Sequence, residues 1–192
     1  QAVYSTTVRL VGDTDLADKY SAAVRVAAGS GLRLCELLGL TVADVNLTNG
    51  TISVTKQLDS YVAWPAGDAM PTQKPKHGSA RDVRVWKRVQ TDLTFLVNNA
   101  GTDGVLIPPR TPGRLWADGW GNLLKAARQS IDWKWTPHYL RHHYGSYSTA
   151  PIDDGGFGQS YAAVQRWMGH ATLDTTMRTY IHDVSAKDGW IG

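Results

Sequence analysis

Apolar residues recur at helical spacing over most of the chain. The first such segment begins at Thr14, and Gly29 is placed to end it in a left-handed conformation; its apolar face carries Leu16, Tyr20, Ala23, Val24 and Ala27. A shorter helix is predicted after Gly31, ending near Gly39. Helical patterns return over residues 89–97, 120–131, 137–147, 161–168 and 173–182. The pattern predicts a mainly helical protein.

Strand signals are confined to one region near the beginning of the chain. The pair Asn49-Gly50 is a strong hairpin signal, because alternating apolar residues flank it on both sides (Val45, Leu47, Ile52 and Val54). The segment 56–86 has the features of the rest of a small sheet, with Val83 and Val85 alternating in its last strand. We expect a mainly α fold with a small antiparallel three-stranded β-sheet, that is, an α+β fold.

The composition is that of one globular domain. Of the 192 residues, 42% are hydrophobic and 19% are charged, which is enough to bury a core. A net charge of +3 and a pI near 9.0 suit a polyanionic partner, but only mildly. The single cysteine, Cys35, excludes an internal disulfide and favours a reducing compartment. No apolar run approaches the roughly 18 residues that a membrane-spanning helix needs, so we expect no membrane association.

Three predicted helices have a basic residue in the first turn, namely Arg33, His138 and His170. Helix N-termini are natural phosphate sites, because free backbone N–H groups and the positive end of the dipole attract anions. Arg141 lies three residues after His138 and so on the same helical face. Two arginines and two histidines would hold a phosphate without a metal, and Tyr180 would supply a nucleophile.

Four stretches resemble, in order, the motifs of the tyrosine recombinase or phage integrase family. They are Ser-Gly-Leu-Arg-Leu-Cys-Glu-Leu (30–37), Pro-His-Tyr-Leu-Arg-His-His (137–143), Trp-Met-Gly-His-Ala-Thr-Leu (167–173) and Thr-Thr-Met-Arg-Thr-Tyr-Ile-His (175–182). Each motif alone would be weak evidence, whereas four in the right order are specific. The resemblance covers residues 16–183 and implies the fold of that family's catalytic domain.

The resemblance implies a role for each matching residue. Arg33 and Arg141 match the arginines that bind the non-bridging oxygens of the scissile phosphate. His138 matches a histidine that transfers protons, and His170 one that hydrogen-bonds the phosphate. Glu36 matches an acidic residue that supports the site.

The resemblance also implies a catalytic lysine and the nucleophile. Lys76 is the best match for a lysine that lies on the hairpin between the second and third strands, and Lys74 is the alternative. Tyr180 matches the tyrosine that attacks phosphorus and forms a temporary 3′-phosphotyrosine. Tyrosine has an unperturbed pKa of about 10, so it needs a base and cationic neighbours to react. The bond energy is kept for rejoining, so no cofactor, ATP or metal is expected.

The implied function is site-specific recombination, in the integration or excision of a mobile element such as a phage. The expected partners are double-stranded DNA, three further copies in a homo-tetramer on that DNA, and DNA-bending accessory proteins; the isolated domain should be monomeric. The expected location is the bacterial cytoplasm, at the nucleoid. Residues 1–13 would be a linker from a missing N-terminal DNA-binding domain, residues 14–183 the catalytic domain, and residues 184–192 a C-terminal tail.

Other interpretations remain open at this point. A type IB topoisomerase shares the chemistry but relaxes supercoils as a monomer, and a DNA-binding regulator could keep the fold without catalysis. His138 and His142 lie four residues apart and could bind a metal, though no third ligand follows at a recognised spacing. Arg33 could simply form an ion pair with Glu36, and Tyr180 could be a core tyrosine.

Overall fold

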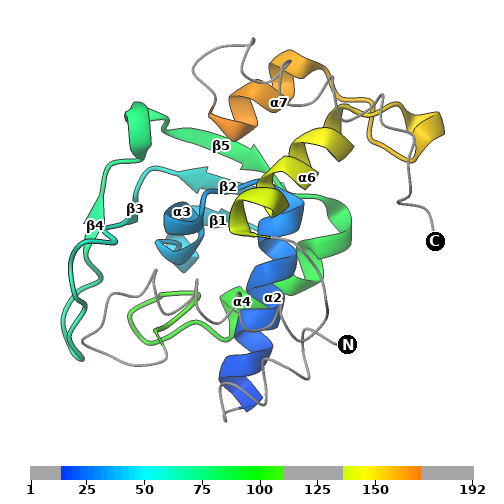
Figure 1. Ribbon diagram of the computed structural model, residues 1–192. Coiled ribbons are helices and arrows are strands. Elements are labelled where there is room, and N and C mark those ends of the chain that lie inside the picture. The colour runs from blue at the N-terminus through cyan, green and yellow to red at the C-terminus, as the bar shows by residue number, and fades with distance from the viewer. Residues whose placement is uncertain (1–13, 110–135, 170–192) are drawn as a thin grey trace.

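The computed structural model describes residues 14–109 and 136–169 (Figure 1). The predicted linker (1–13), the predicted helices 120–131 and 173–182, and the predicted tail (184–192) lie outside the described residues. Within the described part, the fold is mainly helical with a small antiparallel sheet, so the predicted fold class is confirmed.

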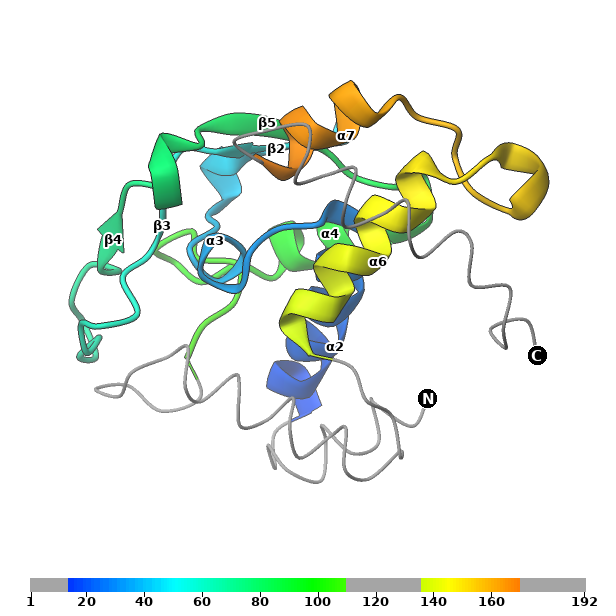
Figure 2. The same ribbon diagram turned by 45° about the horizontal axis from the view of Figure 1, so that its top comes forward.

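The long helix α2 (Thr14–Ser30) is central to the core. It packs against α4 (Gln90–Asn98) and α6 (Pro137–Thr149), and Figure 2 shows α6 lying across it. Of its predicted apolar positions Tyr20, Ala23 and Ala27 are buried, whereas Leu16 and Val24 are only partly buried and pack at the edge of the core. The prediction that Gly29 ends this helix is wrong, because α2 continues to Ser30.

Gly31, rather than Gly29, takes the left-handed conformation, with φ of +65°. A side chain at Gly31 would meet the ring of Tyr144, a fully buried residue of α6. The backbone between α2 and the next helix, α3 (Leu34–Leu38), therefore needs glycine both for its conformation and for space. This close approach places the start of α3 beside α6.

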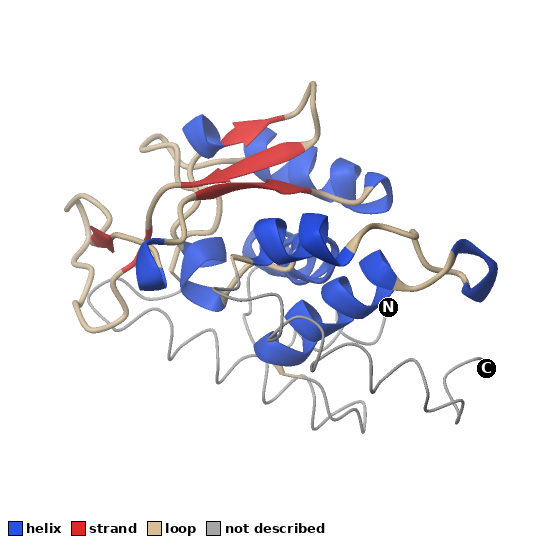
Figure 3. Cartoon of the chain, turned by 90° about the horizontal axis from the view of Figure 1, so that it is seen from above, coloured by secondary structure: helices blue, strands red, loops and turns tan. Residues whose placement is uncertain are grey.

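Three strands form the sheet in the order β1 (Val45–Asn46), β2 (Thr51–Val54) and β5 (Arg81–Arg84). The pairs Val45↔Ile52 and Ile52↔Val83 set an antiparallel register, in which Ile52 and Val83 are fully buried. Gly50 has φ of +63° in the β1–β2 hairpin. The three-stranded sheet and its hairpin at Asn49-Gly50 are confirmed, and Figure 3 shows its strands side by side with helices around them.

The segment between β2 and β5 differs from the prediction that it continues this sheet. Its strands β3 (Gln57–Leu58) and β4 (Thr72–Gln73) pair only with each other. Leu58 is buried because β3 packs against α3, which directs the chain away from the end of β2. Residues 57–73 therefore form a separate hairpin, visible apart from the sheet in Figure 1.

In the described part of the chain, four short 3₁₀ helices and one more α-helix accompany these elements. The 3₁₀ helices are η1 (Val42–Asp44), η2 (Lys76–Gly78), η3 (Lys87–Val89) and η4 (Ile152–Asp154). Helix α7 (Tyr161–Met168) begins at the predicted residue, with Ser160 as its N-cap, and packs against β5 and α6. None of the helices in the described part is long and apolar enough to cross a membrane.

Replacing Gly31 by alanine should destabilise the protein by at least about 3 kcal/mol, because the left-handed conformation costs roughly 1–2 kcal/mol and the clash with Tyr144 adds to it. Gly67→Ala is the matched control, since Gly67 has φ of +87° but nothing within 4 Å of an added Cβ. Urea denaturation measures both. Equal losses in the two variants would contradict the role given to Tyr144.

Candidate active site

Arg33 and Glu36 form the first part of the site, at the start of α3. Arg33 is the N-cap of α3, and its backbone N–H donates to Glu36 Oε2 at 2.8 Å. Its Nη1 donates to Glu36 Oε1, also at 2.8 Å. The Glu36 side chain is fully buried, whereas that of Arg33 is 25% exposed. The glutamate thus holds Arg33 at both its backbone and its guanidinium group.

Arg81, the first residue of β5, grips the same carboxylate from the other side. Its Nη1 and Nη2 donate to Glu36 Oε1 and Oε2 at 2.9 and 2.8 Å, which is a bidentate ion pair. Burial alone would raise the pKa of Glu36. The hydrogen bonds and charge of Arg81, and then those of Arg33, outweigh burial and lower this pKa to about 2. The carboxylate is therefore ionised at neutral pH.

Helix α6 brings the third arginine. Thr136 caps this helix by accepting from the Tyr139 N–H at 3.1 Å, and Pro137 follows at the first helical position, as the sequence predicts. His138 is exposed in the first turn, and Arg141 is buried one turn later. Arg141 Nη1 donates to Gly31 O at 2.5 Å, so the turn that requires glycine also orients this arginine.

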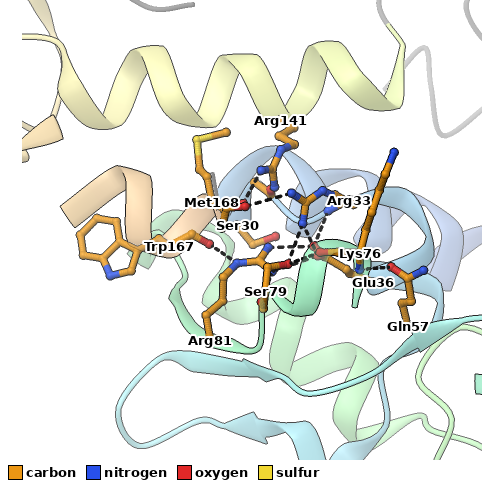
Figure 4. A network of polar contacts seen from close by, with 12 residues as sticks. Ser30, Arg33, Glu36, Gln57, Lys76, Ser79, Arg81, Arg141, Trp167 and Met168 are labelled. Carbon is orange, nitrogen blue, oxygen red and sulfur yellow. Dashed lines mark hydrogen bonds and ion pairs between the residues drawn. The ribbon is translucent and has the colours of Figure 1, made fainter. Parts of the chain in front are cut away.

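The three arginines converge on the C-terminal end of α7. Arg81 Nε donates to Trp167 O at 2.6 Å, Arg141 Nη2 donates to Met168 O, and Arg33 Nη2 donates to Gly169 O at 3.0 Å (Figure 4). The last carbonyls of a helix lack intrahelical partners and carry the negative end of its dipole. Three arginines on three successive carbonyls supply both the missing hydrogen-bond donors and positive charge at the negative end of the dipole. They thereby fix this end of α7 in place.

Lys76 lies on η2, immediately before β5. Ser79 Oγ accepts from Arg33 Nη1 at 3.1 Å and donates to Lys76 O at 2.9 Å, which ties the lysine turn to Arg33. The side chain of Lys76 is exposed, and in Figure 4 it extends from η2 toward the side of the network where α6 lies. Lys74 is also exposed, but it lies outside η2 and directly follows the last residue of β4.

His170 and Tyr180 lie outside the described residues. The chain position before His170 is nevertheless fixed, since Gly169 O accepts from Arg33. Of the seven residues that the sequence predicts for the site, the structure brings Arg33, Glu36 and Arg141 together. The Lys76 turn lies beside them. His138 lies on the exposed first turn of α6. The catalytic roles of these residues stay predictions.

Comparison with known proteins agrees with the resemblance found in the sequence motifs. Residues 13–187 match the phage integrase family. The chain belongs to this family. The tyrosine recombinase XerC of Serratia marcescens is 31% identical over 167 residues, which cover 87% of this chain and 48% of that protein. XerD of Oceanobacillus iheyensis is 29% identical and is covered to 54%. The chain thus spans about half the length of these curated relatives.

Solved structures support the family's fold. The Tn1549 transposon integrase, in complex with transposon right end DNA, superposes with a TM-score of 0.66 at 22% identity, covering 92% of this chain and 58% of that one. The XerA recombinase gives a TM-score of 0.61 at 20% identity, with 91% and 56% covered. At such identities the likeness shows the fold of a tyrosine recombinase catalytic domain.

Two residues of this phage integrase site were missed by sequence reasoning, namely Arg81 and Ser79. A signal for Arg81 was present, because strand alternation places it on the same inward face as the buried Val83 and Val85. An arginine on an inward face requires a buried acid, and Glu36 was already a candidate. Ser79 follows from no sequence pattern.

The simpler interpretation of Arg33 holds in part, since Arg33 does form an ion pair with Glu36. That pair engages only one edge of the guanidinium group. Among the described residues, Arg33 Nε–H and the second N–H of Nη2 have no acceptor, which leaves them for an incoming oxygen. The alternative of a metal bound by His138 and His142 finds no third ligand in the described part of the chain. The centroids of the two rings lie 4.3 Å apart, edge to face, but nowhere in residues 14–109 and 136–169 do three potential metal ligands cluster.

The low pKa of Glu36 makes the site sensitive to acid. Because its folded pKa of about 2 lies below the unfolded value of 4.5, its ionised form stabilises the folded state above pH 4.5 by about 3 kcal/mol, and this contribution is lost as the pH falls toward 2. Glu36→Gln should therefore be less stable than the parent at pH 7, with the gap closing below pH 4.5.

Urea denaturation at a series of pH values measures this gap. Asp68→Asn is the control, since Asp68 is exposed on the 57–73 hairpin and its loss should change stability little at any pH. A Glu36→Gln gap that stays constant from pH 7 to pH 3 would show that the carboxylate charge is not what holds the two arginines.

Proposed function

We propose that this protein is the catalytic domain of a site-specific DNA recombinase that integrates or excises a mobile element. One observation carries the proposal: in a chain of the phage integrase family, Arg33 from α3 and Arg141 from α6 meet at the end of α7, with the Lys76 turn beside them. The exposed edge of Arg33 offers two parallel N–H donors, the geometry that suits the non-bridging oxygens of a phosphate.

The proposed reaction is a pair of transesterifications. The Tyr180 oxygen attacks phosphorus, the bond from phosphorus to the deoxyribose 5′-oxygen breaks, and a 3′-phosphotyrosine and a free 5′-hydroxyl result. A 5′-hydroxyl from another strand then attacks the phosphotyrosine and releases Tyr180. Arg33 and Arg141 stabilise the charge that the phosphate gains, and by analogy with oxyanion holes the loss of either should cost roughly 3 kcal/mol of barrier.

Proton transfers accompany both bonds. Tyr180 must lose its proton as it attacks, and we assign this transfer to His138, while His170 hydrogen-bonds the phosphate. The departing 5′-oxygen needs a proton, which we assign to the ammonium group of Lys76. Within the described part, no hydrogen bond or ion pair holds the Lys76 Nζ, so it is free to reach a substrate oxygen.

The substrate would be two double-stranded DNA sites held by four copies of the protein, aided by DNA-bending accessory proteins, in a bacterial cytoplasm. Support for DNA comes from the net charge of +3 and from relatives solved with DNA, including the Tn1549 integrase with transposon end DNA and XerH with its difH substrate. Phosphate contacts dominate such affinity, so binding should weaken steeply with salt.

The decisive test is a covalent adduct. The chain is mixed in EDTA with a pool of nicked duplexes of randomised sequence, and complexes that survive SDS are isolated. The nick lets the cleaved fragment diffuse away and traps the intermediate. Wild type should form an adduct, Tyr180→Phe should form none, and Tyr61→Phe, which alters a tyrosine that is 90% exposed, should behave as wild type.

The alternatives give other results in the same assay. A chain that retains the DNA pool on a filter but never forms an adduct would be a DNA-binding regulator, and the catalytic assignments would be withdrawn. An adduct accompanied by relaxation of supercoiled plasmid by monomers, without exchange between two sites, would indicate a topoisomerase.

The role of Lys76 has its own test. Lys76→Ala should slow cleavage by about 10²–10⁴-fold, the usual contribution of a general acid. A substrate with sulfur in place of the bridging 5′-oxygen should restore the rate, because a thiolate leaves without a proton (thiol pKa about 8.5). Lys74→Ala is the matched control and should cleave both substrates normally. The reverse pattern would transfer the role to Lys74.

A further inference from the structure

Arg81 is the most heavily engaged side chain of the network, yet it cannot reach a ligand. Its side chain is only 7% exposed. Nη1 and Nη2 donate to Glu36, Nη1 also donates to Ser79 O at 3.0 Å, and Nε donates to Trp167 O at 2.6 Å. These hydrogen bonds use both edges of the guanidinium group, so a phosphate finds no open edge on Arg81, in contrast to Arg33.

The partners of Arg81 come from three separate segments of the chain. Glu36 belongs to α3, Ser79 to the turn between η2 and β5, and Trp167 to the last turn of α7 (Figure 4). The first two segments each carry a group assigned to the reaction, Arg33 and Lys76, and the third ends at Gly169, whose carbonyl accepts from Arg33. One buried cation therefore holds three segments of the chain together, in addition to the hydrogen bonds that Arg33 makes to Ser79 and Gly169.

We propose that Arg81 is a positioning residue, which holds Arg33 and the Lys76 turn in register with the end of α7. The inference rests on the proposed function for its consequence in catalysis. Arg81 acts through Glu36, whose Oε1 is shared with Arg33 Nη1, and through Ser79, whose Oγ accepts from the same Nη1. Both routes end on the guanidinium group of Arg33, whose remaining N–H donors we assign to the substrate phosphate.

Lysine cannot replace this arginine. A lysine at position 81 would keep the charge beside Glu36, but a single ammonium group cannot donate in a planar fork to both carboxylate oxygens and also reach Trp167 O. Arg81→Lys therefore keeps the net charge of the site and removes its geometry. Arg84→Lys is the matched control, since Arg84 lies on the same strand with an exposed side chain.

The first measurement follows Arg33 directly and needs no activity. In the chain labelled with ¹⁵N-arginine, NMR reports how fast the Arg33 guanidinium group rotates, and an Arg33→Lys sample assigns its signals. We expect slow rotation in the parent and in Arg84→Lys, and rotation at least tenfold faster in Arg81→Lys. Unchanged rotation of Arg33 in a folded Arg81→Lys protein would overturn the inference.

A second variant covers the case in which Arg81→Lys does not fold. Ser79→Ala removes a half-buried hydroxyl group and so only one of the two routes from Arg81 to Arg33. It should remain folded, and the rotation of Arg33 should rise by a smaller factor, about threefold. No change in Ser79→Ala, with Arg81→Lys unfolded, would reduce Arg81 to a structural residue and refute the positioning role.

The second measurement uses any duplex on which wild type forms the adduct. Arg81→Lys should lower the rate constant at saturating DNA by up to about 100-fold, as expected for misplaced catalytic groups, with the half-saturating DNA concentration nearly unchanged. A purely structural role would lower the fraction of active protein instead. Combining Arg81→Lys with Glu36→Gln should slow the reaction no further than the slower single variant, because the two residues act as a unit.

The two proposals fail in different ways. If wild type forms no adduct, the proposed function is wrong, while the rotation of Arg33 still decides whether Arg81 positions it. If wild type forms the adduct and Arg81→Lys reacts at the wild-type rate, the positioning role is wrong and the proposed function stands.

Discussion

The buried carboxylate of Glu36 is the interaction on which the rest of the site depends. A charge in the interior of a protein is costly unless it is paired and hydrogen-bonded, and here two arginines from different segments meet that demand. The pairing works in both directions: the arginines keep the pKa of Glu36 low, and the glutamate keeps their guanidinium planes fixed. Removing either side would leave an unpaired buried charge.

The end of α7 adds a second constraint. Successive carbonyls of Trp167, Met168 and Gly169 each accept from a different arginine, so electrostatic and hydrogen-bonding needs of the helix terminus coincide. Because Arg33 and Arg141 also belong to α3 and α6, the helix end ties together elements that lie far apart in sequence. A substrate phosphate would enter a set of donors already arranged by protein carbonyls, and little reorganisation would be needed.

Much of the fold could be predicted because helical spacing, the Asn49-Gly50 turn and strand alternation are local signals. The left-handed residue after α2 was placed two residues too early, at Gly29, since only the approach of Tyr144 decides that Gly31 takes this conformation. The β3–β4 hairpin was misassigned because packing of Leu58 against α3 is a long-range effect. Arg33, Glu36 and Arg141 could be nominated from motifs, whereas Ser79 joins the site through tertiary contacts alone.

The register of β5 limits which changes of length the chain tolerates just before this strand. Arg81 pairs with Val54 and points inward, while its neighbour Asp82 points outward to Ser53. A one-residue insertion that shifted this register would turn Arg81 outward, away from Glu36. The 57–73 hairpin, which pairs only with itself, can therefore change in length without moving Arg81, whereas the short stretch from Lys76 to Arg81 tolerates hardly any change in length.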